Sequence, residues 1–327
     1  MALWAKRGAR LAEALAVLGI TLPLFTAVAL GYLCVRFGLF KPADMRLFGS
    51  FVLNVALPAL LFLAVASRDA REVFNLTYMA VFAAGALATI AVTFTLLTAL
   101  KTTPSRRAVA VMGAACANSG FIGYPLMLLA FPDIAGQILA LNMLVENILI
   151  IPLCLVLFEL AKPQKSANIA RLIGQIVLGV LRRPMVIALL LGLVVSLLKL
   201  PLPAPLTQTA GLFAASASAL ALFTIGGALV GLPFKGHRAL AGLTAAGKLT
   251  LHPAMVALAL VAAVALGLPP LSREMAAAVV LSAAIPMFSI YALFASELGH
   301  EGMASIAQLL ATGASFVTLS ALMLWLL

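Results

Sequence analysis

Two charged residues lie deep inside long apolar stretches of this chain. Glu146 and Lys248 each lie about ten residues from an end of their stretch, and at about 1.5 Å per residue a helix would bring both to about 15 Å depth. Charges in apolar surroundings are costly and usually functional. We therefore expect an internal ion pair, or a Lys248 that replaces a coupling cation. The alternative is that one of the two side chains reaches an interface.

His252 follows Lys248 by four residues, and the two therefore share one face of a helix. An imidazole titrates near neutral pH, so His252 is a candidate proton carrier. The ordinary alternative is a hydrogen-bonded packing residue.

Polar and helix-breaking residues are concentrated in one short string of another apolar stretch: Asn118, Ser119, Gly120, Gly123 and Pro125. Proline lacks an amide hydrogen and clashes with the carbonyl four residues earlier, and glycine permits unusual backbone angles. We predict an unwound stretch, which a membrane tolerates only in the protein interior or beside a cavity. The exposed helix N-terminus would favour an anion. A simple kinked packing helix is the alternative.

A later apolar stretch carries a second, less polar break at Pro286 and Ser289. Two broken helices that cross would place four helix ends around one site. We expect Asn118 to bind a carboxylate or to align the unwound backbone. Asn54, just before Pro58, is a further candidate that either contacts substrate or stabilises a kink.

The composition excludes a water-soluble protein. Hydrophobic residues make up 64% of the 327 residues and charged residues only 9%, whereas soluble domains carry about a quarter charged residues. The net charge of +11 could suggest a nucleic-acid partner. The Lys and Arg residues lie in short loops between apolar segments, which instead indicates topology control and contact with the headgroups of a lipid bilayer, with no nucleic acid.

The fold class that we predict is an all-α polytopic membrane protein of ten transmembrane helices. A bilayer core needs about 20 apolar residues per helix, and no alternating pattern of the β-barrel type is present. Ten segments qualify: 15–36, 47–67, 75–100, 107–130, 136–160, 184–200, 208–232, 239–267, 275–297 and 303–327. A polar linker (161–183) then separates a first five-helix repeat (1–160) from a second repeat (184–327).

Three pairs of residues recur at one offset of 161: Leu30-Gly31 with Leu191-Gly192, Leu61-Phe62 with Leu222-Phe223, and Pro125 with Pro286. A repeat of five helices must insert its second copy upside down. Such inverted repeats are typical of secondary transporters, and the crossed broken helices would be the fourth and the ninth.

The positive-inside rule predicts the orientation. One set of loops holds nearly twice as many Lys and Arg residues as the other, which places that set in the cytoplasm and both termini in the periplasm. Lys6, Arg7 and Arg10 oppose this assignment. The apolar run behind them lacks a cleavage site, so we read it as the first membrane helix.

Several chemistries have no support in the sequence. Cys34, Cys116 and Cys154 have no paired spacing and read as packing residues. No acidic cluster resembles a sodium cage, and no phosphate loop or nucleophile elbow is present. We therefore expect no metal, no cofactor and no enzymatic activity.

The string from Asn118 to Pro125 resembles the fourth-helix motif of the auxin efflux carrier family. The string Asn54–Phe62 resembles the second helix of that family, and Ala295–Gly299 resembles its ninth. The resemblance covers essentially the whole chain, which lacks the long loop of plant exporters and is therefore of the short bacterial type.

The resemblance implies a scaffold of the first, second, sixth and seventh helices and an elevator-like transport domain of the other six. It implies a substrate site at the crossover and a homodimer formed through the scaffold, in the bacterial inner membrane. Many bacterial members carry a polar residue where this chain has Ile290, and Ser289 or Tyr291 would substitute for it.

The function that we expect is secondary transport of a small organic anion, auxin-like or malonate-like. Asn118, Ser119, Gly120, Gly123 and Pro125 would form one half of the site. Pro286 and Ser289 would form the other half. The alternatives are a non-transporting receptor or channel and a cation/proton antiporter, and the scarcity of buried Asp argues against the antiporter.

Overall fold

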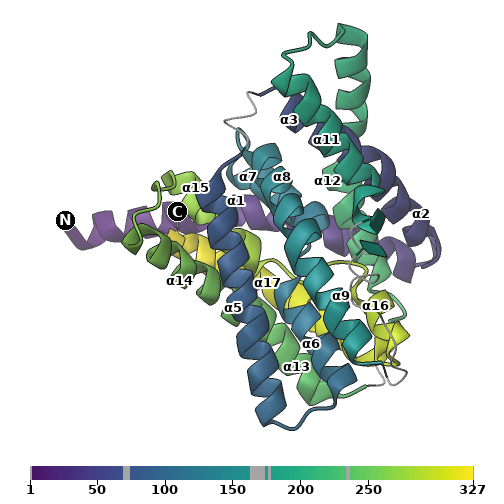
Figure 1. Ribbon diagram of the computed structural model, residues 1–327. Helices are drawn as coiled ribbons and strands as arrows, with labels where there is room; N and C mark the ends of the chain where they lie inside the picture. The colour runs from purple at the N-terminus through teal and green to yellow at the C-terminus, as the bar shows by residue number, and fades with distance from the viewer. Residues whose placement is uncertain (1, 69–73, 163–173, 176–177, 233–235, 327) are drawn as a thin grey trace.

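The computed structural model describes residues 2–68, 74–162, 174–175, 178–232 and 236–326, with side chains from residue 14 onward. These residues form helices and loops, with one isolated β-bridge (Figure 1). The predicted linker 161–183 lies mostly outside the described residues. The helical architecture agrees with the predicted fold class.

Seven helices in the described part of the chain are long and apolar enough to cross a membrane. They include α1 (Ala2–Arg36), α5 (Leu76–Ala99), α12 (Ala204–Ala228) and α17 (Glu301–Leu326). The other three are composite helices, each joined by a five-residue π-turn: α2, η1 and α3 (Asp44–Ala66); α8, η3 and α9 (Ala135–Leu160); and α13, η4 and α14 (Arg238–Ala265).

The remaining three predicted segments fold as helices that are short or interrupted. Helix α11 spans only Pro184–Leu197. The segment 107–130 becomes α6 (Pro104–Ala115), the π-turn η2 (Ser119–Gly123) and α7 (Tyr124–Ala130). The segment 275–297 becomes α15 (Arg273–Ala284) and α16 (Tyr291–Glu297), with residues 285–290 between them.

Every π-turn stands at the same distance before a proline. The turns η1 (Val52–Ala56), η2, η3 (Glu146–Ile150) and η4 (Gly247–Leu251) end two residues before Pro58, Pro125, Pro152 and Pro253. A proline in a helix cannot donate to the carbonyl four residues back and clashes with it. The wider turn moves that carbonyl aside, so these helices continue past their prolines.

Reciprocal glycine contacts join α1 to α12 and α11 to α3. A Cβ atom on Gly31 would lie 2.0 Å from the carbonyl oxygen of Phe223, and one on Gly192 would lie 2.8 Å from that of Phe62. Only glycine allows backbones to approach so closely. These four residues are the members of two of the three predicted repeat pairs, and each glycine packs on the phenylalanine of the opposite half.

The third predicted pair is not equivalent in the structure. Pro125 is the second residue of α7, after the interruption, whereas Pro286 lies within the interruption between α15 and α16. The helices α6 and α15 are both twelve residues long and follow the N-cap residues Thr103 and Ser272. Helices α6 and α15 therefore correspond to each other at a sequence offset that differs from 161. The predicted pairing of Pro125 with Pro286 is wrong.

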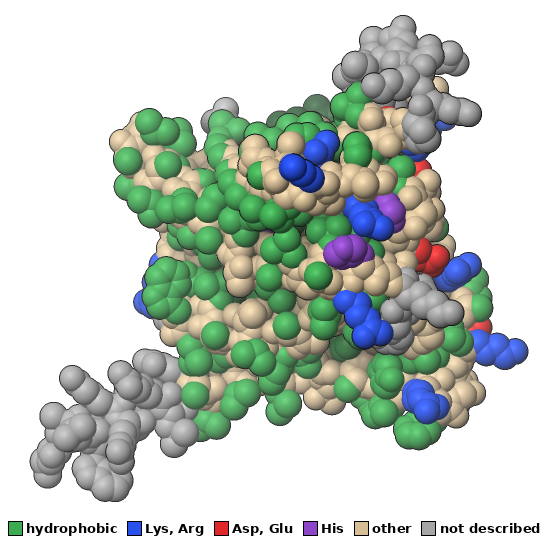
Figure 2. All heavy atoms as spheres, turned by 90° about the horizontal axis from the view of Figure 1, so that it is seen from below, with side chains coloured by type: hydrophobic (Ala, Val, Ile, Leu, Met, Phe, Trp, Pro, Cys, Tyr) green, Lys and Arg blue, Asp and Glu red, His purple; other side chains and the backbone are tan. Residues whose placement is uncertain are grey.

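The outer surface is apolar. Leu212, Val261 and Trp325 are among the large hydrophobic side chains that are mostly exposed. Figure 2 shows one face of the molecule, where hydrophobic side chains cover large areas and a few Lys and Arg side chains lie mainly on its right half. Such a surface is stable in lipid and not in water.

Candidate substrate site between the interrupted helices

The two interrupted helices meet through their backbones. Ala117 and Met287 form an antiparallel bridge, and the Asn118 N–H donates to the carbonyl oxygen of Pro286 at 3.0 Å. The interruption of the first helix covers 116–118, just before the predicted glycine-proline string. The unpaired backbone groups of the two breaks thus satisfy one another, as burial in a membrane requires.

Asn118 connects both breaks through its side chain. Its Nδ2 donates to Ser289 Oγ at 3.0 Å, and its Oδ1 accepts from the N–H of Phe121 at 3.4 Å. The Asn118 carbonyl oxygen accepts from the N–H groups of Ile122 and Gly123. Of the two roles predicted for Asn118, alignment of the unwound backbone is therefore present in the structure.

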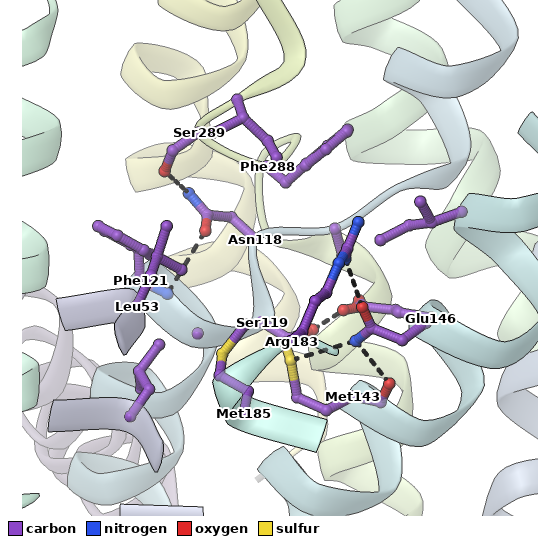
Figure 3. Close-up of a pocket in the computed structure, with 16 residues that line it drawn as sticks. Leu53, Asn118, Ser119, Phe121, Met143, Glu146, Arg183, Met185, Phe288 and Ser289 are labelled. Atoms are coloured by element: carbon purple, nitrogen blue, oxygen red, sulfur yellow. Dashed lines mark hydrogen bonds between the residues drawn. The ribbon is translucent and has the colours of Figure 1, made fainter. Parts of the chain in front are cut away.

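A hollow opens beside this meeting point (Figure 3). Its wall combines residues of both interruptions and of η2 with residues of η1, α3, α8, η3, α9 and the start of α11. The lining residues are Leu53, Leu57, Ala117, Asn118, Ser119, Gly120, Phe121, Met143, Glu146, Asn147, Ile151, Arg183, Met185, Phe288, Ser289 and Ile290. Apolar walls with a few convergent polar groups are typical of small-molecule sites.

Glu146 is the carboxylate in this wall. Its side chain is 2% exposed, and its Oε1 accepts a hydrogen bond from Ser119 Oγ at 2.6 Å. Among the described residues this is the one hydrogen bond that its carboxyl group receives. The first residue of η3 thus presents an acid to the same hollow as Asn118.

Arg183 is the cation in this wall, and sequence reasoning missed it. Its Nη1 donates to Asn147 Oδ1 at 2.6 Å (Figure 3). Arg183 follows Arg182 at the end of the polar linker 161–183, so the sequence pattern predicts a loop charge. The overlooked signal was the length of α11: fourteen residues cover about 21 Å, less than a bilayer core of about 30 Å. A helix of this length does not reach both faces of a bilayer core, so the residue before it need not lie in a loop exposed to water.

A family model described as "Membrane transport protein" matches residues 16–325. The chain belongs to this family. It is the auxin efflux carrier family, so the resemblance carried by the motif around Asn118 is confirmed. The chain is therefore a membrane-embedded protein of a transporter family.

Two named relatives agree with the family assignment. The "Putative malonate transporter" of Rhizobium meliloti is 30% identical over 255 residues, which cover 75% of this chain and 76% of that protein. The "Uncharacterized transporter YfdV" of Escherichia coli K12 is 27% identical over 219 residues, which cover 64% of this chain and 67% of that protein.

In this auxin efflux carrier family member, Lys248 lies outside the hollow. Its side chain is 0% exposed. Its Nζ lies 2.7 Å from His252 Nδ1 and donates to the carbonyl oxygen of Ala283 at 3.0 Å. The shared face with His252 is as predicted. No ion pair joins Lys248 to Glu146 among the described residues, because each of the two groups has other partners.

The remaining predicted residues differ in their relation to the hollow. Ser119, Gly120 and Ser289 line it, whereas Gly123, Pro125 and Pro286 lie in the interrupted helices without lining it. A Cβ atom on Gly120 would lie 2.8 Å from Leu57 Cδ1. Gly120 therefore allows the first interrupted helix to approach α3.

Tyr291 and Asn54 have local partners away from the hollow. The Tyr291 hydroxyl donates to the carbonyl oxygen of Val109 at 3.0 Å, which joins α16 to α6. The Asn54 Nδ2 donates to the carbonyl oxygen and the hydroxyl of Ser50 one turn earlier. Both contacts are typical of side chains that stabilise helices.

Proposed function

We propose that this chain is a secondary transporter of a small organic anion, a mono- or dicarboxylate, which binds in the hollow at the meeting point of the interrupted helices. The observation that carries the proposal is the chemistry of the wall. Arg183 supplies a positive charge, and the Asn118 amide and the Ser289 hydroxyl supply neutral polar groups. Leu53, Phe288 and other apolar residues enclose them.

The substrate class follows from this combination of groups. A guanidinium group forms strong, directed hydrogen bonds to a carboxylate, while the apolar walls suit a short carbon skeleton. The name of the Rhizobium meliloti relative points to malonate, and malonate-like or auxin-like acids are the substrates that we propose here.

We further propose ten membrane helices in two inverted repeats, with the interrupted helices crossing. The reciprocal contacts of Gly31 and Gly192 support this arrangement, because they relate the two halves by a pseudo-two-fold axis. The scaffold would consist of α1, α2–α3, α11 and α12. The transport domain would consist of the remaining helices and would move like an elevator against the scaffold.

The walls of the hollow fit such a movement. Leu53, Leu57 and Met185 belong to the proposed scaffold, and Asn118 and Glu146 belong to the proposed transport domain. A site between two bodies opens to one side or the other as they slide. We propose a homodimer through the scaffold in the bacterial inner membrane, with both termini in the periplasm.

Lys248 would act as a fixed positive charge that replaces a coupling cation. Its ammonium group is bound to a carbonyl of the last turn of α15, where the partial negative charge of a helix end attracts cations. His252 would hold the ammonium group in place.

The decisive experiment compares two neighbouring arginines. In proteoliposomes, we expect Arg183→Gln to weaken the binding of labelled malonate and its counterflow by about ten- to a hundredfold, since hydrogen bonds to charged groups contribute about 1.5–3 kcal/mol. Arg182→Gln is the matched control, because Arg182 is exposed and does not line the hollow. Equal loss in both variants would place the anion site elsewhere.

Two alternatives make different predictions in the same vesicles. A receptor with this fold would bind malonate without exchanging label. A cation/proton antiporter would dissipate a pH gradient when a cation is added and would not respond to malonate. The observation that favours an antiporter is Glu146, which faces the hollow with an acidic group.

A further inference from the structure

Glu146 and Arg183 share the wall of one hollow without contacting each other. Arg183 is bound to Asn147, and Glu146 is bound to Ser119. If the hollow takes an organic anion beside Arg183, an ionised Glu146 would repel it, because two negative charges interact strongly where little water screens them. The anion site is therefore incomplete unless the charge on Glu146 is neutralised.

No described cation neutralises Glu146 by direct contact. Arg183 donates to Asn147, and Lys248, which faces the same interior from η4, is bound to His252 and Ala283. Lys162 pairs with Glu159 and Glu297, and none of these three residues lines the hollow. By direct contact the carboxyl group of Glu146 has a hydroxyl donor alone, and Lys248 acts on it only through space.

The other titratable groups near Glu146 are engaged elsewhere as well. On α5 the hydroxyl of Tyr78 donates to Asn142 at 3.0 Å. The thiol of Cys116, at the interruption after α6, faces Cys154 of α9 with 3.8 Å between the sulfur atoms. Neither group contacts Glu146 directly, so a proton that reaches this carboxyl group would come from water that enters the hollow.

We propose that Glu146 binds one proton when the organic anion enters, so that proton and anion are carried together. The inference rests on the proposed function. A carboxylate oxygen of Glu146 takes the proton from water on the side of entry and returns it to water on the other side. No covalent bond to the substrate forms or breaks. Ser119 donates to the carboxylate and holds it toward the hollow.

A sodium ion in place of the proton would need a different site. Sodium prefers several oxygen ligands, and among the described residues Glu146 belongs to no group of three or more His, Cys, Asp or Glu side chains. Glu146 with the single hydroxyl of Ser119 has the composition of a proton site. A sodium gradient is nevertheless one arm of the test.

The test uses proteoliposomes and labelled malonate with an imposed pH gradient. We expect wild-type protein to accumulate malonate from the acidic side, up to about tenfold per pH unit for one proton. Glu146→Gln, which mimics the protonated acid, should abolish accumulation and make the counterflow rate independent of pH. Glu159→Gln is the matched control on the same composite helix, because its carboxylate pairs with Lys162 at the surface.

The proposal is overturned if Glu146→Gln still accumulates malonate from the acidic side, or if a sodium gradient drives wild-type uptake and a pH gradient does not. Loss of malonate counterflow in the wild type itself would instead contradict the proposed function. A second measurement needs no variant. In weak buffer, at a pH above the ionisation ranges of both malonate and Glu146, the binding of malonate to the wild type should take up about one proton per bound anion, and no uptake would equally overturn the proposal.

Discussion

The ammonium group of Lys248 is held by a carbonyl oxygen of α15 and an imidazole nitrogen of its own helix. Burying a charge in this way is expensive unless each hydrogen of the group finds a partner. The partner from α15 is the carbonyl of Ala283, close to the interruption at Pro286. Lys248 therefore stabilises the end of a helix on which the candidate substrate site is built.

Replacing Lys248 with methionine tests this role, because methionine keeps the length and removes the charge. We expect malonate counterflow to fall at least tenfold while the protein still inserts, since one lost buried partner costs about 1–3 kcal/mol. Counterflow and the yield of monodisperse protein are the measurements. Lys199→Met, at an exposed position, is the control, and normal transport by Lys248→Met would refute the role.

The sequence identified the polar residues of the candidate site that lie within apolar helices, but it did not identify Arg183, which lies next to a loop. Asn118, Ser119 and Glu146 line the hollow as a search for polar groups in apolar stretches would suggest. Arg183 escaped that search because its neighbours are polar too. Glu146 and Lys248 are near enough for their charges to interact, but the predicted ion pair does not form by direct contact, because each group has a nearer partner.

At the scale of helices, glycine contacts set the spacing of the proposed scaffold. We expect Gly31→Val to lower the thermal unfolding midpoint or to abolish stable expression, because the new side chain would collide with the Phe223 carbonyl, and overpacking costs about 1–3 kcal/mol or more. Gly19→Val is the matched control on the same helix, since nothing lies within 4 Å of a Cβ atom there. Equal midpoints for the two variants would contradict the close contact.

The sequence predicted that the helix within 107–130 is broken, but not where. Proline and glycine pointed to 118–125, whereas the chain is non-helical at 116–118 and helical again from Ser119. The reason is a tertiary contact. The N–H of Asn118 bonds Pro286 in a distant segment, and this partner determines where the helix opens. Pro125 is accommodated locally by its π-turn, which a search for helix breakers does not anticipate.

At the scale of the whole molecule, the elevator proposal requires α8 to slide along α3. A Cβ atom on Gly136 of α8 would lie 2.7 Å from Ala64 Cβ of α3, whereas disulfide-bonded residues have Cβ atoms about 3.5–4.5 Å apart. A cysteine pair at these positions therefore needs the helices to part by about 1 Å.

We expect the double variant Ala64→Cys, Gly136→Cys, in a background without the native cysteines, to stop transport when oxidised and to recover on reduction. Malonate binding should persist in the oxidised form, because neither residue lines the hollow. Single-cysteine variants are the controls. Full transport by the cross-linked protein would exclude a sliding movement between these two helices.

The π-turns have a consequence for how such membrane helices can vary. Each turn holds one residue more than an ordinary helical turn, which is equivalent to a one-residue insertion and rotates everything beyond it by about 100°. A helical-wheel projection therefore loses its phase at Pro58, Pro125, Pro152 and Pro253. Deleting a single residue just before one of these prolines would remove the extra residue and return the turn to α-helical geometry. The helix beyond it would keep its faces, but the proline would again clash with the carbonyl four residues earlier.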